Sequence, residues 1–304
     1  MTLIACVKVN DGVVLAADSA LTLKTDTVLS GGRIDATNLY NNANKVFNLV
    51  GDAPVGLLAC GNLTIGGVSL SNLVKGFRLQ AADAASTAFV DLSTINVLAI
   101  ATNFQQSLQN AYTNPYNGRQ EGEGFNIQMV VAGYDAGAER SKEYIVGLKT
   151  EKDAAGALNL VAEGPTQIMY QGTTGIDVGY GVYVNGQPEV AHRLFKGYGS
   201  QLNGTIDAIP TIADQAERHN METVQRALFL ELASPSMPIQ DAIDLGAFLI
   251  TCTTEVLRFM VGPQTVGGPI EIAAITKYEC FKWVRRKHYY SKEFNPYEGR
   301  GSVI

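Results

Sequence analysis

The first eighteen residues contain two short apolar runs separated by a turn. Residues 3–9 and 13–18 are rich in Val, Ile and Leu, and an Asn-Asp-Gly turn at 10–12 lies between them. Asp-Gly pairs supply the positive φ angles that tight hairpin turns need, so we predict two paired antiparallel strands. The second strand of a hairpin returns to the start of the first, and this pairing therefore brings Asp18 close to Thr2.

Apolar positions also predict a second hairpin and two helices. Residues 44–50 alternate between polar and apolar, and 55–61 form a short apolar run beyond a proline-containing turn, which is typical of a hairpin. Residues 65–86 and 92–113 carry apolar side chains at three-to-four-residue spacing, which predicts two helices packed as a layer. Further strands are predicted at 125–135, 143–148, 157–162, 167–171 and after Gly267-Gly268, with further helices at 222–233 and 239–260.

Composition and charge narrow the class of protein. Of the 304 residues 46% are hydrophobic and 17% charged, which is ordinary for a globular enzyme with a single large core. The net charge of −6 argues against nucleic acid as the main partner. No signal peptide is visible, and no apolar run approaches the roughly 18 to 20 residues that span a bilayer. We predict a cytoplasmic protein without a membrane partner.

The cysteines and histidines do not predict a metal or cofactor site. Cys6, Cys60, Cys252 and Cys280 are scattered without metal-type pairs, and we expect buried, reduced thiols. The three histidines also lack the spacing of metal ligands. We therefore assign no metal and no cofactor to the chain.

Thr2 has the chemistry of a nucleophile that carries its own base. A small side chain after Met1 generally allows the methionine to be removed, which would leave Thr2 with a free α-amine. Such an amine has an unperturbed pKa of about 7.7 to 8.0, so part of it is unprotonated at neutral pH and accepts the hydroxyl proton of its own residue. A lysine held nearby by Asp18 would lower the pKa of the amine further.

The residues from Thr2 onwards resemble a known family of hydrolases. The run TLIACVKVNDGVVLAADS is similar to the start of mature proteasome β subunits and their bacterial relatives of the HslV type, which are N-terminal-nucleophile (Ntn) hydrolases. In that family the mature chain begins with the catalytic threonine, and an aspartate ends a Val-Val-x-Ala-Ala-Asp-Ser run. The resemblance assigns these positions to Thr2 and Asp18. The alternative is an ordinary hairpin with a frayed terminus.

Two downstream segments extend the resemblance. Lys45, just before Val-Phe, resembles the family's catalytic lysine; the alternative is a solvated lysine at a strand edge. Ala-Cys-Gly at 59–61 resembles the strand-to-helix corner whose backbone amide binds the oxyanion. A backbone amide serves this purpose where the chain approaches closely, which a glycine permits, so we choose Gly61 with Cys60 as the rival.

Two hydroxyl residues match the family pattern less closely. Thr173, in Gly-Thr-Thr-Gly, takes the place of the serine in the family's Gly-Ser-Gly turn. Before Gly-Gly the family places an Asp and, three residues later, a Ser, but these positions are Pro263 and Val266 here. Thr265 is a neighbouring hydroxyl that would substitute for the serine, and no carboxylate replaces the aspartate.

The resemblance implies an α+β fold of a particular architecture. It is a four-layer αββα sandwich, in which two antiparallel sheets face each other between helix layers. We expect the Ntn-hydrolase domain to span residues 1–275, with insertions near 19–44 and 179–219. The first insertion is predicted as loop and short strand. Residues 276–304 are expected to form a basic and aromatic extension that lies on its own surface or clasps a neighbouring subunit rather than nucleic acid.

The function that the resemblance implies is that of a threonine endopeptidase. Thr2 would cleave peptides or unfolded proteins inside a homo-oligomer, ring or helical, with an ATP-dependent unfoldase as a partner. One alternative is a catalytically silent ring or scaffold subunit, which the missing Asp and Ser favour. Another is an Ntn amidohydrolase that acts on a small amide, with the two insertions closing its pocket.

Overall fold

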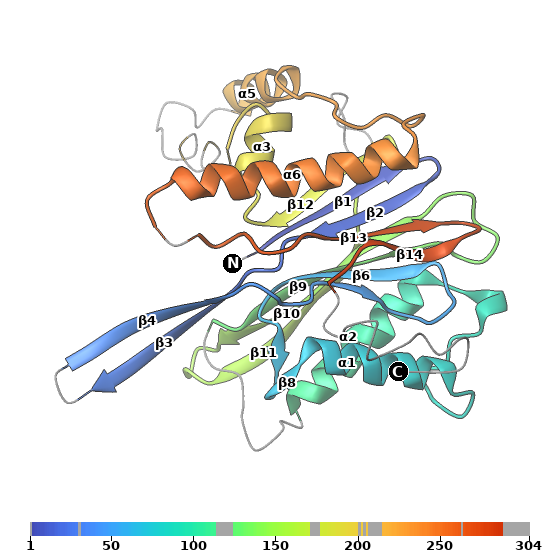
Figure 1. Cartoon of the computed structure of the whole chain (residues 1–304), viewed down its shortest axis with the longest axis horizontal. Coiled ribbons are helices and arrows are strands. Elements are labelled where there is room, and N and C mark those ends of the chain that lie inside the picture. Colours follow the sequence, from blue (N-terminus) through green and yellow to red (C-terminus); the bar gives the residue numbers. More distant parts are fainter. Residues whose placement is uncertain are drawn as a thin grey trace, which may run out of the picture.

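The computed structural model describes residues 2–29, 32–113, 124–170, 177–199, 202, 205, 215–262 and 264–287. Two five-stranded sheets lie face to face in the body of the molecule, with helices on their outer sides (Figure 1). Neighbouring strands in both sheets are antiparallel. The prediction of a mixed fold of helices and antiparallel sheets is confirmed at that level.

The first sheet contains the predicted N-terminal hairpin. Its order is β12 (Gly181–Gly186), β1 (Leu3–Val9), β2 (Gly12–Ala17), β13 (Glu271–Thr276) and β14 (Cys280–Arg285). Strands β1 and β2 pair with Ile4 opposite Ala17, and every residue of both strands is buried. Burial on both faces explains why their sequences are almost continuously apolar. The predicted C-terminal extension at 276–304 contains β14, which forms the edge of this sheet.

The second sheet contains the second predicted hairpin. Its order is β11 (Leu158–Gln167), β10 (Lys142–Lys152), β9 (Asn126–Gly133), β6 (Val55–Gly61) and β5 (Val46–Asn48). β5 and β6 pair as expected from the alternation in 44–61. The separate strand predicted at 167–171 is wrong, because β11 runs to Gln167 and 168–170 are not strand. Residue 171 lies outside the described part of the chain.

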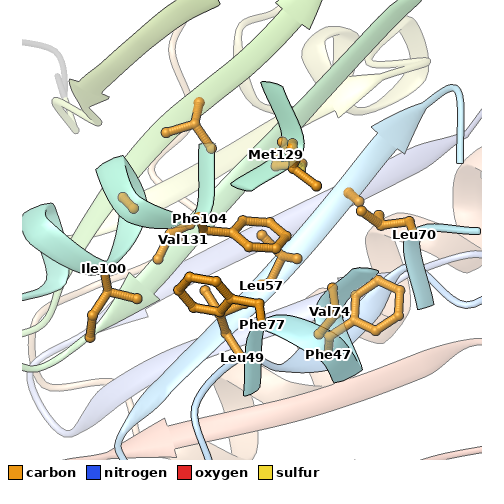
Figure 2. Close-up of a cluster of buried hydrophobic side chains, with 14 of the residues drawn as sticks. Phe47, Leu49, Leu57, Leu70, Val74, Phe77, Ile100, Phe104, Met129 and Val131 are labelled. Carbon is orange, nitrogen blue, oxygen red and sulfur yellow. The ribbon is translucent and has the colours of Figure 1, made fainter. Parts of the chain in front are cut away.

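Three clusters of buried side chains occupy the spaces between these elements. One lies between the sheets and joins β1, β2 and β13 to β6 and β9. A second joins the other sheet's outer face to α1 (Leu70–Ala82) and α2 (Val97–Thr113), where Phe77 and Phe104 meet edge to face with ring centroids 5.1 Å apart (Figure 2). The third joins the first sheet to α3 (Glu189–Phe195) and α6 (Ile239–Phe259). Gly246 lets α6 approach β2, since a Cβ there would lie 3.2 Å from the Cβ of Ala16.

Residues 21–40 form a structure that the sequence did not predict. β3 (Leu21–Leu29) and β4 (Gly32–Tyr40) pair as a two-stranded ribbon, which projects from the body of the molecule (Figure 1). The prediction of loop and short strand is wrong here. The segment 21–29 contains the β-branched residues Thr22, Thr25, Thr27 and Val28, and this composition favours a strand despite its polarity.

Helix boundaries differ from the prediction where glycines or short elements intervene. β7 (Thr64–Ile65) and β8 (Val68–Ser69) form a small hairpin around Gly66 and Gly67, both with positive φ, so α1 begins at Leu70 and not at 65. A 3₁₀ turn, η1 (Leu92–Thr94), precedes α2, and α5 (Gln215–Ala227) ends before the predicted limit at 233. The helix predicted at 239–260 is confirmed as α6.

Two further findings concern the apolar length of the helices and the state of the cysteines. No helix in the described ranges is long and apolar enough to cross a membrane. All four cysteines are free, but only Cys6 and Cys60 are buried. Cys252 and Cys280 are partly exposed, and the expectation that all four are buried is wrong for these two.

Candidate active site

The N-terminal hairpin places Asp18 beside the start of the chain. The pairing of Ile4 with Ala17 puts the next residue of the second strand opposite Leu3. The backbone N–H of Leu3 donates a hydrogen bond of 3.0 Å to Asp18 Oδ1. Thr2 is 3% exposed and therefore lies largely inside the protein. The proximity of Asp18 to Thr2 that the hairpin predicted is present.

Asp18 joins four segments of the chain through one buried carboxylate. Its Oδ1 accepts from Leu3 N at 3.0 Å and from Lys45 Nζ at 2.7 Å. Its Oδ2 accepts from the backbone N–H groups of Ala20 and Gly267, each at 3.0 Å. Four donors fill the lone-pair sites that a carboxylate offers. The carboxylate is thus held in one orientation, with the lysine ammonium on the side of the chain start.

Lys45 is fully buried, and its ammonium lies in surroundings that oppose its charge. Besides Asp18, its Nζ donates to the carbonyl of Ala20 at 2.5 Å. Burial lowers the pKa of Lys45, the carboxylate of Asp18 opposes this change, and the charge of Lys287 lowers the pKa further. The backbone carbonyl of Lys45 accepts from Ala59 N at 2.9 Å, which fixes the lysine against β6.

Gly186 of β12 lies between Thr2 and Cys60, which is near the end of β6. Gly186 of β12 pairs with Leu3 and has a φ of +93°. A Cβ on Gly186 would lie 2.0 Å from the carbonyl oxygen of Thr2 and 3.7 Å from the Cβ of Cys60. Only glycine leaves room for this approach, and the 59–61 corner is therefore a close neighbour of Thr2.

The antiparallel ladder distinguishes the amides of Gly61 and Cys60. Asn62 N–H bonds to the carbonyl of Asn126 on β9, whereas Ala59 N–H bonds to Lys45 on the opposite edge. Successive N–H groups along a strand alternate between its two edges. The N–H of Gly61 therefore points to the same edge of β6 as the N–H of Ala59, at a position where β5 no longer runs alongside. The N–H of Cys60 points to β9.

The two remaining predicted hydroxyls are those of Thr173 and Thr265. Thr173 lies outside the residues that the structure describes, as does Pro263. Thr265 is buried and stands two residues before Gly267, but among the described residues it makes no hydrogen bond to Asp18 or Lys45. Val266 packs in the apolar cluster beneath α6, so the position of the family's serine is part of the core.

Sequence reasoning missed a second buried ion pair next to Lys45. Glu271, the first residue of β13, is 2% exposed, and its Oε2 lies 3.4 Å from Lys45 N and 3.3 Å from Lys287 Nζ. Burial lowers the pKa of Lys287, and Glu271 opposes this change. A glutamate next to the apolar run of β13 was a usable signal for Glu271. Lys287 carried no such signal among the other basic residues of the C-terminal segment.

Other features of the chain lie away from Thr2. A cavity of about 390 Å³ opens at the edge strand β12, and Thr2 is not among its lining residues. Within the described ranges, no group of three or more His, Cys, Asp and Glu side chains is arranged to hold a metal ion. What the arrangement around Thr2 offers is a hydroxyl, a buried ammonium and an outward backbone amide, which are components of acyl transfer.

Comparison with known proteins gives only distant similarity. No family model and no curated protein matches the chain. Among solved structures, it is similar to the Anbu (Gly-1) mutant from Hyphomicrobium sp. strain MC1, with 15% identity over 94% of this chain and 86% of that chain and a TM-score of 0.46. It is also similar to the helical assembly of the Anbu complex from Pseudomonas aeruginosa, with 12% identity, coverage of 94% and 88%, and a TM-score of 0.43.

These comparisons correct the family assignment made from the sequence. The assignment to proteasome β subunits and HslV-like Ntn hydrolases does not hold for this chain, because no family model and no curated protein matches it, and solved structures at 15% and 12% identity show no family. The chemistry of Thr2 rests on the geometry of its site.

Proposed function

We propose that the protein hydrolyses peptide bonds with Thr2 as the nucleophile, after cleavage of the chain before Thr2 gives that residue a free α-amine. One observation carries the proposal. The carboxylate of Asp18 holds Leu3 N–H at 3.0 Å and Lys45 Nζ at 2.7 Å, which puts a buried ammonium beside the residue that would bear the amine. The three core clusters support a four-layer αββα sandwich as the scaffold of this site.

The first half of the reaction forms an acyl-enzyme. The α-amine of Thr2 takes the proton from its own Oγ, and Oγ bonds to the carbonyl carbon of the scissile peptide. The carbonyl π electrons move to oxygen, and the N–H of Gly61 donates to this oxyanion. When the oxyanion collapses, the C–N bond breaks and the leaving nitrogen takes the proton from the α-ammonium. The ester on Thr2 and a free amine product remain.

The second half restores the enzyme. The α-amine takes a proton from a water molecule, whose oxygen bonds to the ester carbon. The tetrahedral intermediate then releases Thr2 Oγ, which takes the proton back from the α-ammonium. A carboxylic acid leaves, and Thr2 has the same protonation as at the start.

Lys45 contributes its positive charge to both halves. An ammonium close to the α-amine disfavours protonation of the amine and so keeps the base available near neutral pH. It also stabilises the negative charge that develops on Oγ. Because burial lowers the pKa of Lys45, we expect activity to fall on the alkaline side as Lys45 loses its proton. On the acidic side it falls as the α-amine becomes protonated.

The test is the intact mass of the protein before and after incubation with a β-lactone, an acylating probe for such nucleophiles. We expect a chain that begins at Thr2 and gains one probe mass. Thr2→Ala should lose this gain, and Thr64→Ala, at an exposed threonine on β7, should keep it. Peptide turnover by Thr2→Ala at the rate of the unchanged protein would contradict the proposal.

A catalytically silent scaffold is the second candidate, and the burial of Thr2 favours it. In the chain that carries residue 1, Thr2 is 3% exposed and offers a peptide little access. In this case the chain keeps the residues before Thr2 and takes no probe. Turnover of an acylated small molecule without peptide cleavage would instead indicate an amidohydrolase that acts on a small amide.

We also propose that the protein forms homo-oligomers. Three consecutive apolar residues at the end of α6 and just beyond it face solvent: Phe259 is 82% exposed, Met260 55%, and Val261 fully. Adjacent exposed apolar side chains of this size are typical of interaction surfaces. Sedimentation at micromolar concentration should show an oligomer that Phe259→Ser dissociates, and a monomer would contradict the proposal. The unfoldase partner stays a prediction.

A further inference from the structure

Lys287 follows β14, and its ammonium reaches back into the interior. Only 6% of its side chain is exposed. The Nζ donates to Ser19 Oγ at 2.6 Å and to the carbonyl of Ala43 at 2.5 Å. Ser19 follows Asp18, and Ala43 stands two residues before Lys45. The ammonium of Lys287 therefore joins the two chain segments that carry Asp18 and Lys45, which form the ion pair beside Thr2.

Glu271 provides the negative charge next to which Lys287 is buried. Its Oε2 lies 3.3 Å from Lys287 Nζ and also accepts the backbone N–H of Lys45 at 3.4 Å. In the ladder between β13 and β2 it stands opposite Ala17, directly before Asp18. A buried lysine without a partner of opposite charge is strongly destabilising, so the two residues depend on each other.

The two pairs together place four charged groups from four elements around one another. Asp18 follows β2, Lys45 precedes β5, Glu271 begins β13 and Lys287 follows β14. The thiol of Cys60 on β6 also faces Lys45, and burial raises its pKa to about 12, so it is neutral at physiological pH. Of these groups, Asp18 favours the charged form of Lys45, whereas Lys287 disfavours it.

We propose that Lys287, paired with Glu271, is a positioning residue for the ion pair of Asp18 and Lys45. Lys287 holds the segments at Ser19 and Ala43 together and adds a second positive charge near Lys45. The inference rests on the proposed function of Thr2, which supplies the reaction that this positioning serves. Lys287 does not touch the substrate.

The proposal predicts a particular change in the pH dependence of activity. Lys287→Met removes one positive charge near Lys45, and the pKa of Lys45 rises as a result. Because Lys45 acts in its charged form, activity is lost only above its pKa, and the alkaline limb of the profile moves to higher pH. The loss of two hydrogen bonds lowers kcat about tenfold, with KM unchanged.

The experiment compares four variants by kcat, KM, pH profile and direct titration of the Lys45 ammonium by ¹⁵N NMR. Lys287→Met removes the charge, and Lys287→Arg keeps it. The double variant Lys287→Met/Glu271→Gln removes both charges, so no unpaired charge stays buried. Lys277→Met is the matched control, since Lys277 is in the turn between β13 and β14 and pairs at 2.6 Å with the exposed Glu139.

We expect a raised Lys45 pKa in Lys287→Met, recovery in Lys287→Arg, and no change in Lys277→Met. The double variant removes two opposite charges whose effects on the Lys45 pKa oppose each other, so we expect a lowered kcat there with a smaller change in this pKa. If Lys287→Met does not fold, the kcat of the double variant decides. An unchanged Lys45 titration in folded Lys287→Met overturns the inference, as does an unchanged kcat in the double variant, or failure of both variants to fold, which would make the pair structural.

The NMR titration separates this inference from the proposed function. If the unchanged protein takes no probe at Thr2, the proposed function fails, and the Lys45 titration still decides whether Lys287 acts on Lys45. If Thr2 is labelled and the titration of Lys45 ignores Lys287, the proposed function stands and the positioning inference fails.

Discussion

Two buried lysine–carboxylate pairs bridge the two sheets, and they differ in what else they contact. Lys45 Nζ lies 2.7 Å from Asp18 Oδ1 near the start of β1, and Lys8 Nζ lies 2.9 Å from Glu143 Oε2 near the end of that strand. All four residues are at least nine-tenths buried. In composition, distance and burial the two pairs are alike.

The surroundings of the two pairs are not alike. Glu143 accepts its second bond from Ser141 Oγ at 2.5 Å, and Lys8 donates to the carbonyl of the same Ser141 at 2.7 Å. These bonds connect Lys8, Glu143 and Ser141 to one another, and the centre of the Tyr170 ring lies 5.5 Å from Lys8 Nζ. Asp18 instead bonds to backbone N–H groups at the chain start and in two other segments. A buried pair thus becomes a candidate site through its connection to a nucleophile.

The largest expected effect separates the two lysines. Lys45→Met and Lys8→Met each leave a carboxylate buried without its partner, and each should lower the free energy of unfolding by about 3 to 5 kcal/mol. Only Lys45→Met should slow acylation of Thr2, by about 10²–10³-fold per folded molecule. Chemical denaturation and the rate of β-lactone labelling give the two quantities. Equal labelling rates in the two variants would remove the distinction between the pairs.

A second comparison concerns the two carboxylates. Asp18→Asn removes the charge that raises the pKa of Lys45, so this pKa falls further and the alkaline limb of activity moves to lower pH. The direction is opposite to that expected for Lys287→Met. We expect turnover to fall by about 10²-fold, whereas Glu143→Gln should leave the pH profile in place. A profile that is the same in both variants would show that Lys45 does not act through its charge.

The smallest expected effect tests how closely β12 approaches the chain start. Gly186→Ala would bring a Cβ within 2.0 Å of Thr2 O and displace that residue, slowing labelling by about tenfold. Gly137→Ala has the same kind of positive φ, +73°, with no atom within 4 Å of its Cβ. It should cost about 1 to 2 kcal/mol of stability and leave labelling unchanged. Labelling rates decide, and equal slowing in both variants would point to general destabilisation.

The predicted part of the site follows from local sequence. The two apolar runs pair as predicted, with Val9 opposite Gly12, and this register brings Asp18 to Leu3. The turn itself differs from the prediction, because its two residues are Asn10 and Asp11 and Gly12 has no positive φ; Gly12 instead leaves room for the carbonyl of Ile275, which would lie 2.7 Å from a Cβ there. Residues 2–18 specify that hairpin and its chemistry, but they are a small part of 304 residues, and the family assignment drawn chiefly from them did not hold. A motif of this length predicts the local structure of its own residues more securely than it predicts the family of the whole chain.

Errors in the fold prediction arose where local signals conflict. The segments of β3 and β4 are polar and β4 begins at a glycine, which are features typical of loops, yet their β-branched residues favour strands. Residues 65–69 precede α1 with helical spacing, but the positive φ angles at Gly66 and Gly67 produce a hairpin instead. Periodicity alone does not resolve such cases, because the same apolar positions suit both structures.

The sequence by itself determined the paired strands β1 and β2, the long helix α6, and the pairing of Asp18 with the chain start, since each depends on residues close together along the chain. Tertiary structure alone decided that Gly267 N–H, 249 positions away, bonds to Asp18 and that Lys287 lies against Ser19, 268 positions away. Such contacts depend on how the sheets and the C-terminal segment pack together. No periodicity or local motif encodes that packing.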